Sequence, residues 1–217
     1  MEGLTVIPTG DGSHTISNQS TGDTYHSIHG AVQESQHVFI QSGLQYFLRT
    51  YHKVSIRLLE VGFGTGLNAL LTIKAGEGIG IEYTTLEPSP LGPEIYKSLN
   101  FENREILLSL HQAPWGKGED ITNKFTLIKH QTMLELASLQ ENYFDLVYYD
   151  AFAPNSQPEL WTLDIFQKIR MVMATPSLFV TYCAKGQVKR DLKSAGFKVE
   201  SIPGPPGKRE MIRALLV

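Results

Sequence analysis

Two acidic residues stand at places in this 217-residue chain where a carboxylate could take part in a reaction. Glu87 follows the strand-like run 79–86, and Asp150 follows the strand-like run 144–149. Because ligands bind at the carboxyl edge of an open α/β sheet, we expect both acids to face one site. A carboxylate there could accept hydrogen bonds from a sugar diol, orient an amine or accept its proton.

A third acidic residue, Glu60, precedes three glycines in the segment 58–68 (LLEVGFGTGLN). The pattern predicts a buried strand, a tight turn and a helix over 67–75. Glycines permit positive φ angles and bring backbone amides close to a ligand, and the helix points its unpaired N–H groups at the same place. The glycines occupy relative positions one, three and five, and Leu67 occupies the sixth. A dinucleotide fingerprint has glycine at the sixth position, so the spacing disfavours a nicotinamide dehydrogenase.

The turn from Glu60 to Gly66 resembles the E/D-x-G-x-G-x-G turn of class I S-adenosyl-L-methionine (SAM) methyltransferases. The resemblance implies SAM as the cofactor, with its methionine and ribose portions wrapped by the turn. Glu87 comes 21 residues after Gly66, where a nucleotide-binding unit places an acid against ribose hydroxyls. The alternatives are a purely structural glycine turn and a surface acid that caps a turn. The candidate cofactor-binding residues are Tyr25, Glu60, Gly62, Phe63, Gly64, Gly66, Asn68, Glu87, Gln131 and Asp150.

The residue that holds the adenine is less clearly marked. Many SAM enzymes carry an acid for the adenine amino group just after the third strand, which we expect here at 125–129. In this chain His130 or Gln131 would have to serve, and His130 also fits an ordinary loop residue.

The composition indicates one substantial core. Hydrophobic residues make up 41% of the chain, and no apolar run is long enough to span a membrane. The N-terminus lacks the basic flank and apolar segment of a signal peptide. The single cysteine, Cys183, fits a reducing compartment, so we expect a cytoplasmic protein, and we predict no metal site.

The charge is unevenly distributed along the chain. From Cys183 to the C-terminus there are eight Lys or Arg residues against three acids, whereas the remainder has eleven against nineteen. Such polarity is compatible with one basic face that meets phosphate, although an ordinary solvated helix would also explain it. The candidate phosphate contacts are Lys185, Lys189, Arg190, Lys208 and Arg209.

The elements that would position these residues form an α/β pattern. We predict a class I, Rossmann-like fold with a seven-stranded, mostly parallel sheet and a small N-terminal β-hairpin. The strands are expected at 58–61, 79–86, 125–129, 144–149, 178–182, 198–202 and 211–217, and the hairpin at 4–7 and 14–16. The helices are expected at 43–51, 67–75, 94–99, 104–110, from Pro158 onward and at 186–195, where Gly196 ends the last one.

Two later motifs are more restrictive than the glycine turn. The segments 150–162 (DAFAPNSQPELWT) and 207–211 (GKREM) resemble the methyltransferase part of MnmC. The similarity begins near Asp23, and its entry segment contains Tyr25 and Glu34. We therefore expect an N-terminal β extension over 1–22 and a SAM-dependent methyltransferase domain over 23–217.

The resemblance implies a reaction. MnmC-like enzymes methylate the 5-aminomethyl group of the wobble uridine (U34) in certain tRNAs, giving 5-methylaminomethyl(-2-thio)uridine. In the two-domain members a flavin oxidoreductase follows, which first removes a carboxymethyl group. This chain ends at Val217 without a second glycine-rich βαβ unit, so it looks like the stand-alone form, with a separate oxidoreductase as its partner in the pathway. The tRNA partner would bind through its anticodon stem-loop.

The chemistry of methyl transfer to an amine assigns roles to a few residues. Asp150 would be the catalytic residue, by orienting the amine and accepting its proton, although it could instead contact the charged end of SAM or cap a helix. Phe152 and Pro154 would form the wall beside it, where an aromatic ring can stack on a base, and Trp161 fits the core better. Two other functions stay open: a class I methyltransferase with another substrate, and an RNA-binding relative without activity.

Overall fold

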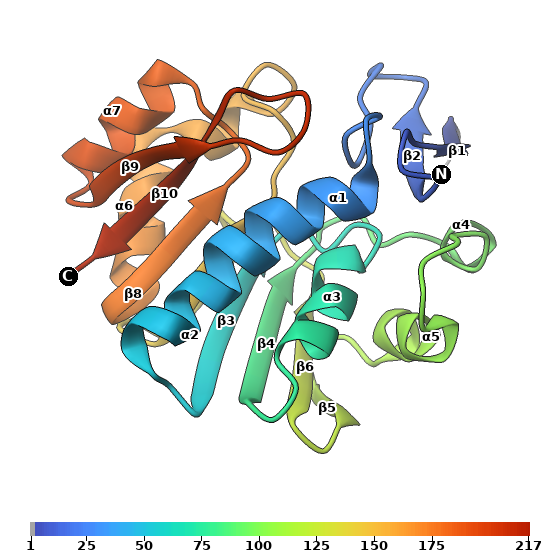
Figure 1. The fold of residues 1–217 in the computed structure, drawn as a ribbon, viewed down its shortest axis with the longest axis horizontal. Helices are drawn as coiled ribbons and strands as arrows, with labels where there is room; N and C mark the ends of the chain where they lie inside the picture. Colours follow the sequence, from blue (N-terminus) through green and yellow to red (C-terminus); the bar gives the residue numbers. More distant parts are fainter. Residues whose placement is uncertain (1–2) are drawn as a thin grey trace.

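The computed structural model describes residues 3–217, and the first two residues of the predicted extension lie outside them. Within the described residues, eight strands form one mixed sheet and two strands form a separate hairpin (Figure 1). The sheet contains β3 (Ser55–Val61), β4 (Gly80–Leu86), β5 (Gly118–Thr122), β6 (Phe125–His130), β7 (Phe144–Tyr149), β8 (Met173–Thr181), β9 (Lys198–Pro203) and β10 (Glu210–Leu216). The hairpin contains β1 (Leu4–Pro8) and β2 (His14–Asn18).

The strand order is β5-β6-β4-β3-β7-β8-β10-β9. Strands β6, β4, β3, β7 and β8 are parallel, and β9 runs in the same direction because both β8 and β9 are antiparallel to β10. The chain moves outward from β3 through β4 and then returns to place β7 on the other side of β3. A crevice at the carboxyl ends of β3 and β7 is therefore the expected ligand site.

The predicted mostly parallel sheet and N-terminal hairpin are confirmed, but the predicted count of seven strands is wrong. The additional strand is β5, which pairs antiparallel with β6 at the edge of the sheet. Its residues are mostly exposed and polar, so they lack the alternation of a half-buried strand. Pairing with β6, which the local sequence does not reveal, is what makes this segment a strand.

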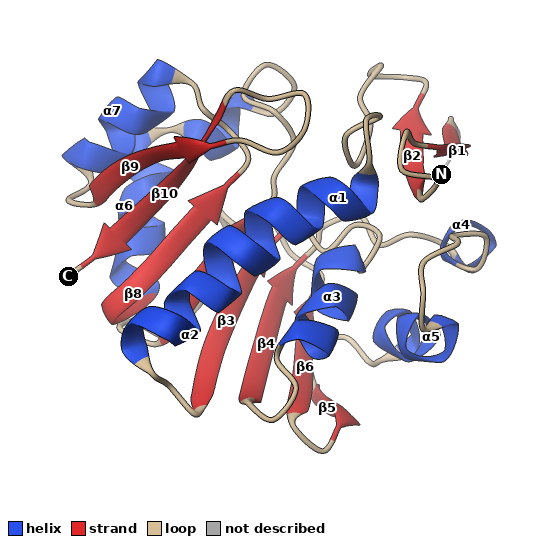
Figure 2. Cartoon of the chain, viewed as in Figure 1, coloured by secondary structure: helices blue, strands red, loops and turns tan. Residues whose placement is uncertain are grey.

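Helices cover both faces of the sheet (Figure 2). One face carries a continuous helix over residues 31–51 together with α3 and α5, and the other face carries α6 and α7. The helical elements are α1 (Ala31–Ser35), η1 (Gln36–Gln45), α2 (Tyr46–Tyr51), α3 (Leu67–Ala75), α4 (Pro93–Tyr96), α5 (Arg104–Gln112), η2 (Pro158–Trp161), α6 (Leu163–Val172) and α7 (Gly186–Ser194). No helix in residues 3–217 combines the length and the apolar character needed to cross a membrane.

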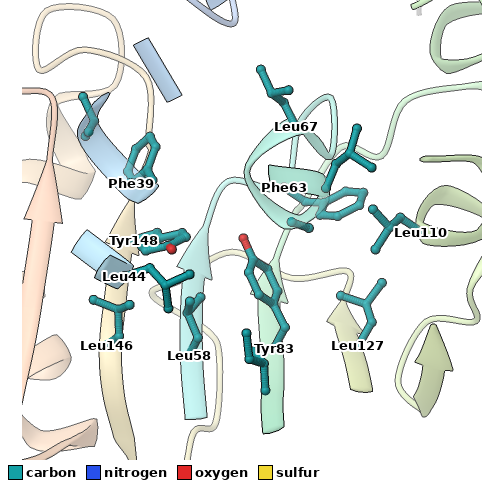
Figure 3. Packing of buried hydrophobic residues seen from close by; sticks show 14 of the residues in the cluster. Phe39, Leu44, Leu58, Phe63, Leu67, Tyr83, Leu110, Leu127, Leu146 and Tyr148 are labelled. Atoms are coloured by element: carbon teal, nitrogen blue, oxygen red, sulfur yellow. The ribbon is translucent and has the colours of Figure 1, made fainter. Parts of the chain in front are cut away.

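The two central strands alternate between these faces. Leu58 and Tyr148 belong to the cluster beneath the helix over 31–51 and α3 (Figure 3), whereas Leu59 and Val147 belong to the cluster beneath α6 and α7. Side chains along a strand point to opposite faces in turn. The same alternation turns Glu60 toward α3, into a buried position.

The helix over 31–51 is longer than the predicted helix at 43–51. Its middle part, Gln36–Gln45, is π-helical, so its buried residues do not follow the 3.6-residue period that a search for α-helices looks for. Gly43 lets this helix approach the sheet, because a Cβ there would lie 3.0 Å from Cγ1 of Val180 and 3.2 Å from Cε1 of Tyr148.

The hairpin is tied to this helix through Asp11, which lies in the turn between β1 and β2. Its Oδ2 accepts the backbone N–H of Gln33 at 2.9 Å, and its Oδ1 accepts the backbone N–H of Ser13 at 3.0 Å. The N-cap residue of the helix, Gly30, has no side chain to satisfy the free N–H groups of the first turn. Asp11 therefore supplies the cap from another element, and the hairpin holds segment 22–34 in place.

Candidate active site

A cavity of about 560 Å³ opens at the carboxyl edge of the sheet. Its walls come from residues 22–28, the glycine turn after β3, the residues that follow β4, β6, β7 and β8, and the side chains of Glu34 and Lys208. Its volume falls within the range of about 300–1,000 Å³ that is typical of small-molecule sites. The cavity lies at the crevice that the strand order predicts.

The glycine turn borders this cavity with two of its three glycines. Gly62 has φ +93°, and a Cβ there would lie 2.7 Å from the backbone oxygen of Asp150. Gly64 has φ +48°, and a Cβ there would lie 3.2 Å from Cδ1 of Tyr25. Gly62 thus lets two strand ends approach each other, and Gly64 lets the segment over 22–28 close on the turn.

The third glycine of the turn was predicted to bind the cofactor, but it lies outside the cavity wall. Gly66 has φ +73° and is the N-cap of α3, and it does not line the cavity. A Cβ there would meet Cζ of Phe63 at 3.2 Å and Nε2 of His111 at 3.3 Å, on the side that packs against α5. Gly66 therefore serves the packing behind the turn, whereas Phe63 lines the cavity as predicted.

Glu87 lies where the sequence places it, beside the glycine turn and on the wall of the cavity. Its Oε2 accepts the backbone N–H of Gly64 at 3.0 Å, and its Oε1 accepts that of Ser89 at 2.8 Å. Burial raises the pKa of Glu87, and these backbone donors oppose that rise. Each carboxylate oxygen keeps a second lone pair, so the group can still accept a ligand hydroxyl.

Asp150 is half-buried at the end of β7 and lines the same cavity. Its Oδ2 accepts a hydrogen bond from Nδ2 of Asn68 at 2.8 Å. Burial raises the pKa of Asp150 to about 7, and the negative charge of Glu34 adds to this rise. The hydrogen bond from Asn68 and the positive charge of Lys208 act in the opposite direction. A group with a pKa near neutrality is well suited to accept a proton.

Two of the predicted cofactor residues are buried and do not line the cavity. Asn68 is buried at the start of α3, where its Nδ2 donates a hydrogen bond to Asp150. Glu60 is fully buried, and its Oε2 accepts a hydrogen bond from the hydroxyl of Thr85 at 2.9 Å. Burial and the nearby charge of Asp150 raise the pKa of Glu60 well above its ordinary value. Neither Glu60 nor Asn68 lines the cavity, so their contact with the cofactor stays a prediction.

The residue predicted to hold the adenine also lies outside the cavity wall. Gln131 is exposed and does not line the cavity, because the chain turns at the end of β6, where the N–H of Thr132 bonds to the carbonyl oxygen of His130 at 3.0 Å. The following residues, Thr132 to Glu135, form the wall, together with Leu86 and Pro88. This wall offers apolar side chains that suit a flat heterocycle.

Phe152 lines the cavity beside Asp150, and its ring meets the ring of Tyr25 edge to face, with centroids 5.2 Å apart. Burial raises the pKa of Tyr25 to about 12, and the charge of Glu87 adds to it. Pro154, which was predicted to share this wall, does not line the cavity. Trp161 is buried in the core, as predicted, and its Nε1–H donates to the backbone oxygen of Phe152 at 2.8 Å.

Lys208 does not point outward as the sequence suggests. Its Nζ donates a hydrogen bond to Oε1 of Glu34 at 2.7 Å and lies 4.1 Å from the centroid of the Tyr182 ring. All three side chains line the cavity. Glu34 and Tyr182 were not predicted as site residues, because they come from an unpredicted stretch of helix and from the residue after β8.

The other predicted phosphate contacts lie outside the cavity. Lys189 forms an ion pair with Glu210 at 2.7 Å, with its side chain largely covered, so its prediction as a free phosphate contact is not supported. Lys185, Arg190 and Arg209 are exposed. Lys185 is the N-cap of α7, Arg190 lies in the middle of α7, and Arg209 belongs to the loop that carries Lys208.

A buried layer behind the glycine turn was not predicted. Nε2 of His26 lies 2.6 Å from Oγ1 of Thr65, and Nε2 of His111 lies 2.9 Å from the backbone oxygen of Thr65. Burial lowers the pKa of each histidine to about 4, so both are neutral at pH 7. These contacts join three segments that are distant in sequence, and no local pattern signals them.

Comparisons with known proteins agree with this geometry. Residues 115–217 match a family described as S-adenosyl-L-methionine-dependent methyltransferase. The chain is 28% identical to the tRNA 5-methylaminomethyl-2-thiouridine biosynthesis bifunctional protein MnmC of Burkholderia multivorans, over 91% of this chain and 33% of that protein. It is 30% identical to the protein of the same name from Campylobacter hominis, over 91% of this chain and 30% of that protein. The chain thus spans about a third of the length of these curated relatives.

Solved structures give the same result. The crystal structure of MNMC2 from Aquifex aeolicus matches with a TM-score of 0.80 and 28% identity, over 99% of this chain and 70% of that chain. Spermidine synthase from Thermotoga maritima matches with a TM-score of 0.61 at 12% identity, over 98% of this chain and 68% of that chain, which shows a shared fold.

The sheet topology and the solved structure of MNMC2 define a Rossmann-like fold, and residues 115–217 resemble the family of SAM-dependent methyltransferases. The chain is similar to MnmC over about a third of that protein's length, and the predicted resemblance is confirmed.

Proposed function

We propose that this protein methylates the 5-aminomethyl group of the wobble uridine of tRNA, with SAM as the methyl donor. The observation that carries the proposal is the position of Asp150. It lies in one cavity with the glycine turn and Glu87, at the end of the strand that opens the MnmC-like segment 150–162. The MnmC relatives are named for the biosynthesis of 5-methylaminomethyl-2-thiouridine in tRNA, and the product proposed here is 5-methylaminomethyl(-2-thio)uridine.

The residues on the cavity wall fit SAM. Gly62 and Gly64 border the cavity, so the turn presents its backbone to a ligand there without side chains. Glu87 presents a carboxylate suited to a ribose diol. The wall over residues 132–135, to which Met133 and Leu134 contribute apolar side chains, would hold the adenine. When bound, SAM supplies an activated methyl group on a sulfonium.

The protein's part in the transfer is to align the amine and to take its proton. A free alkyl ammonium titrates near 10, like lysine, so most of the acceptor is charged at neutral pH. Asp150, with a pKa of about 7, can accept a hydrogen bond from the ammonium and take one of its protons, which frees the nitrogen lone pair to form the new nitrogen–carbon bond. Asn68 holds the carboxylate in one orientation for this step.

The tRNA would reach the cavity through its anticodon loop. Bases in a single-stranded loop can be splayed out and stacked on aromatic rings, and Phe152 presents such a ring at the cavity. We propose that Lys185, Arg190 and Arg209 contact phosphates near it, because they are exposed and basic. An oxidoreductase that generates the aminomethyl group would be the partner in the pathway, and the cytoplasm would be the site of action.

The proposal is tested by incubating the protein with methyl-labelled SAM and tRNA from cells that lack the modification. The tRNA is then digested and the labelled nucleoside is identified. We expect the label on 5-methylaminomethyl(-2-thio)uridine. SAM binding without transfer to tRNA would count against the function, while label on another nucleoside would assign a different substrate.

A further inference from the structure

The ammonium group of Lys208 lies inside the cavity, in a place that two other residues define. Its Nζ is 2.7 Å from Oε1 of Glu34 and 4.1 Å from the centroid of the Tyr182 ring. Glu34 is held independently, because its Oε2 accepts the backbone N–H of Ser27 at 2.8 Å. Tyr182 is also held independently, because its hydroxyl donates to the backbone oxygen of Ala151 at 2.8 Å. The site between Glu34 and Tyr182 therefore keeps its shape when the side chain of Lys208 moves out of the cavity.

A carboxylate beside an aromatic face is a recognition site for a primary ammonium. The carboxylate forms a charge-assisted hydrogen bond, and the ring attracts a cation through its quadrupole. Glu34 and Lys208 are both close enough to Asp150 to shift its pKa, the former upward and the latter downward. The ammonium place and the proposed proton acceptor thus lie in one cavity.

We propose that Glu34 and Tyr182 form the subsite for the acceptor amine, and that the side chain of Lys208 occupies this subsite until a substrate amine displaces it. The nature of that amine, an aminomethyl group on uridine, rests on the proposed function. Two ammonium groups repel each other at hydrogen-bond distance, so the substrate and Lys208 exclude each other.

Lys208 can leave without a change in the fold. Its side chain is 37% exposed, and it is attached by a flexible four-carbon stem to the loop between β9 and β10. Once outside the cavity, its charge would be available to a phosphate, which is the role that the sequence predicts for it. Binding of the substrate would thereby exchange an internal ion pair for a contact with tRNA.

The test measures binding of n-propylammonium at pH 7 by amide NMR titration of the full chain. If Lys208 occupies the subsite about nine-tenths of the time, Lys208→Met should bind n-propylammonium about tenfold more tightly than the unchanged chain. The matched control is Arg209→Met, which removes the same charge from the neighbouring exposed residue and should bind as the unchanged chain does. Adding Glu34→Gln or Tyr182→Leu to Lys208→Met should remove the gain.

Three outcomes overturn the subsite: equal affinity of Lys208→Met and the unchanged chain, an equal gain in Arg209→Met, or a gain that survives both second substitutions. The affinity for SAM, measured for each variant, reports whether that variant is folded. If one of the variants with Glu34→Gln or Tyr182→Leu does not fold, the other is enough for the test. A repeat with 5-aminomethyluridine separates this inference from the function. If n-propylammonium binds but 5-aminomethyluridine does not, the result supports the subsite and counts against the uridine substrate. Methylation of tRNA without the gain supports the function and refutes the subsite.

Discussion

Replacing Asp150 by Asn should make the protein more stable and far less active. Burial raises the pKa of Asp150 in the folded state to about 7, from an ordinary value of 3.8. A raised pKa means that the folded state binds the proton more tightly than the unfolded state. The stability linked to this group is therefore fully present below about pH 4 and is lost as the pH rises through about 7. At about 1.36 kcal/mol per pKa unit, the charged carboxylate costs the folded state about 4 kcal/mol at pH 8.

Asp150→Asn removes that charge and keeps an oxygen that can accept the hydrogen bond from Asn68. We expect urea denaturation at about pH 8 to show a free energy of unfolding higher by up to about 4 kcal/mol, with little difference at about pH 4. The matched control is Asp164→Asn, an exposed acid in the first turn of α6. It should lose about 0.3–1 kcal/mol, since an acid there interacts favourably with the helix dipole.

The same variant should lose activity because it cannot accept a proton. General-base catalysis contributes about 100- to 10,000-fold, so kcat should fall by that factor while the Kd for SAM changes little. In the unchanged protein kcat/KM should rise with pH through about 7, as Asp150 loses its proton, and Asp150→Asn should lack this rise. A kcat within about threefold of the unchanged protein would refute the role of Asp150. No gain in stability at pH 8 would refute the buried charge.

Three further predictions concern the elements around this site. Gly62→Ala should lower the free energy of unfolding in urea by about 3 kcal/mol or more and abolish SAM binding, because its Cβ would lie 2.7 Å from a backbone oxygen. The control is Gly116→Ala, since Gly116 also has a positive φ angle but has open space around it. This variant should lose only about 1–2 kcal/mol of unfolding free energy. In calorimetric titrations with SAM, Glu87→Gln should raise the Kd by about tenfold or more, since a charged acceptor is lost, whereas Gln131→Ala should leave it unchanged; the reverse order would contradict the observed cavity wall. Asp11→Ala should lower the free energy of unfolding by about 1–2 kcal/mol, because the helix over 31–51 loses its cap, and an unchanged stability would show that the hairpin does not support this helix.

The central unit of the fold could be predicted from local patterns. The helix after the glycine turn spans Leu67–Ala75, and the strand before Asp150 spans Phe144–Tyr149, both as predicted. Gly196 ends α7 with φ +96°, as expected of a glycine at that position. In each case the information lies in a periodic apolar run or in a glycine that tolerates a positive φ angle.

Other parts depend on contacts between distant segments. Strand β5 exists because it pairs with β6, and the helix over 31–51 depends on a π-helical stretch and on a cap supplied by Asp11. The direction of Lys208 depends on Glu34, which is 174 residues away in sequence. No local pattern contains this information.

The burial of Glu60 is a different case, because the alternation along β3 contains it. Leu58 faces the helix over 31–51, and Leu59 faces α6 on the other side of the sheet. Glu60 must therefore face the same side as Leu58. At this position Glu60 is buried and does not line the cavity. The resemblance of the turn to methyltransferases pointed to the cofactor correctly but did not separate contacting residues from supporting ones.

The most direct test of this account is the transfer of labelled methyl groups from SAM to unmodified tRNA, with the unchanged protein and Asp150→Asn compared side by side. We predict that the unchanged protein places the label on 5-methylaminomethyl(-2-thio)uridine. Asp150→Asn should still bind SAM but should transfer the label at a rate at least about 100-fold lower. Label on no tRNA nucleoside, or equal transfer by the two proteins, would contradict it.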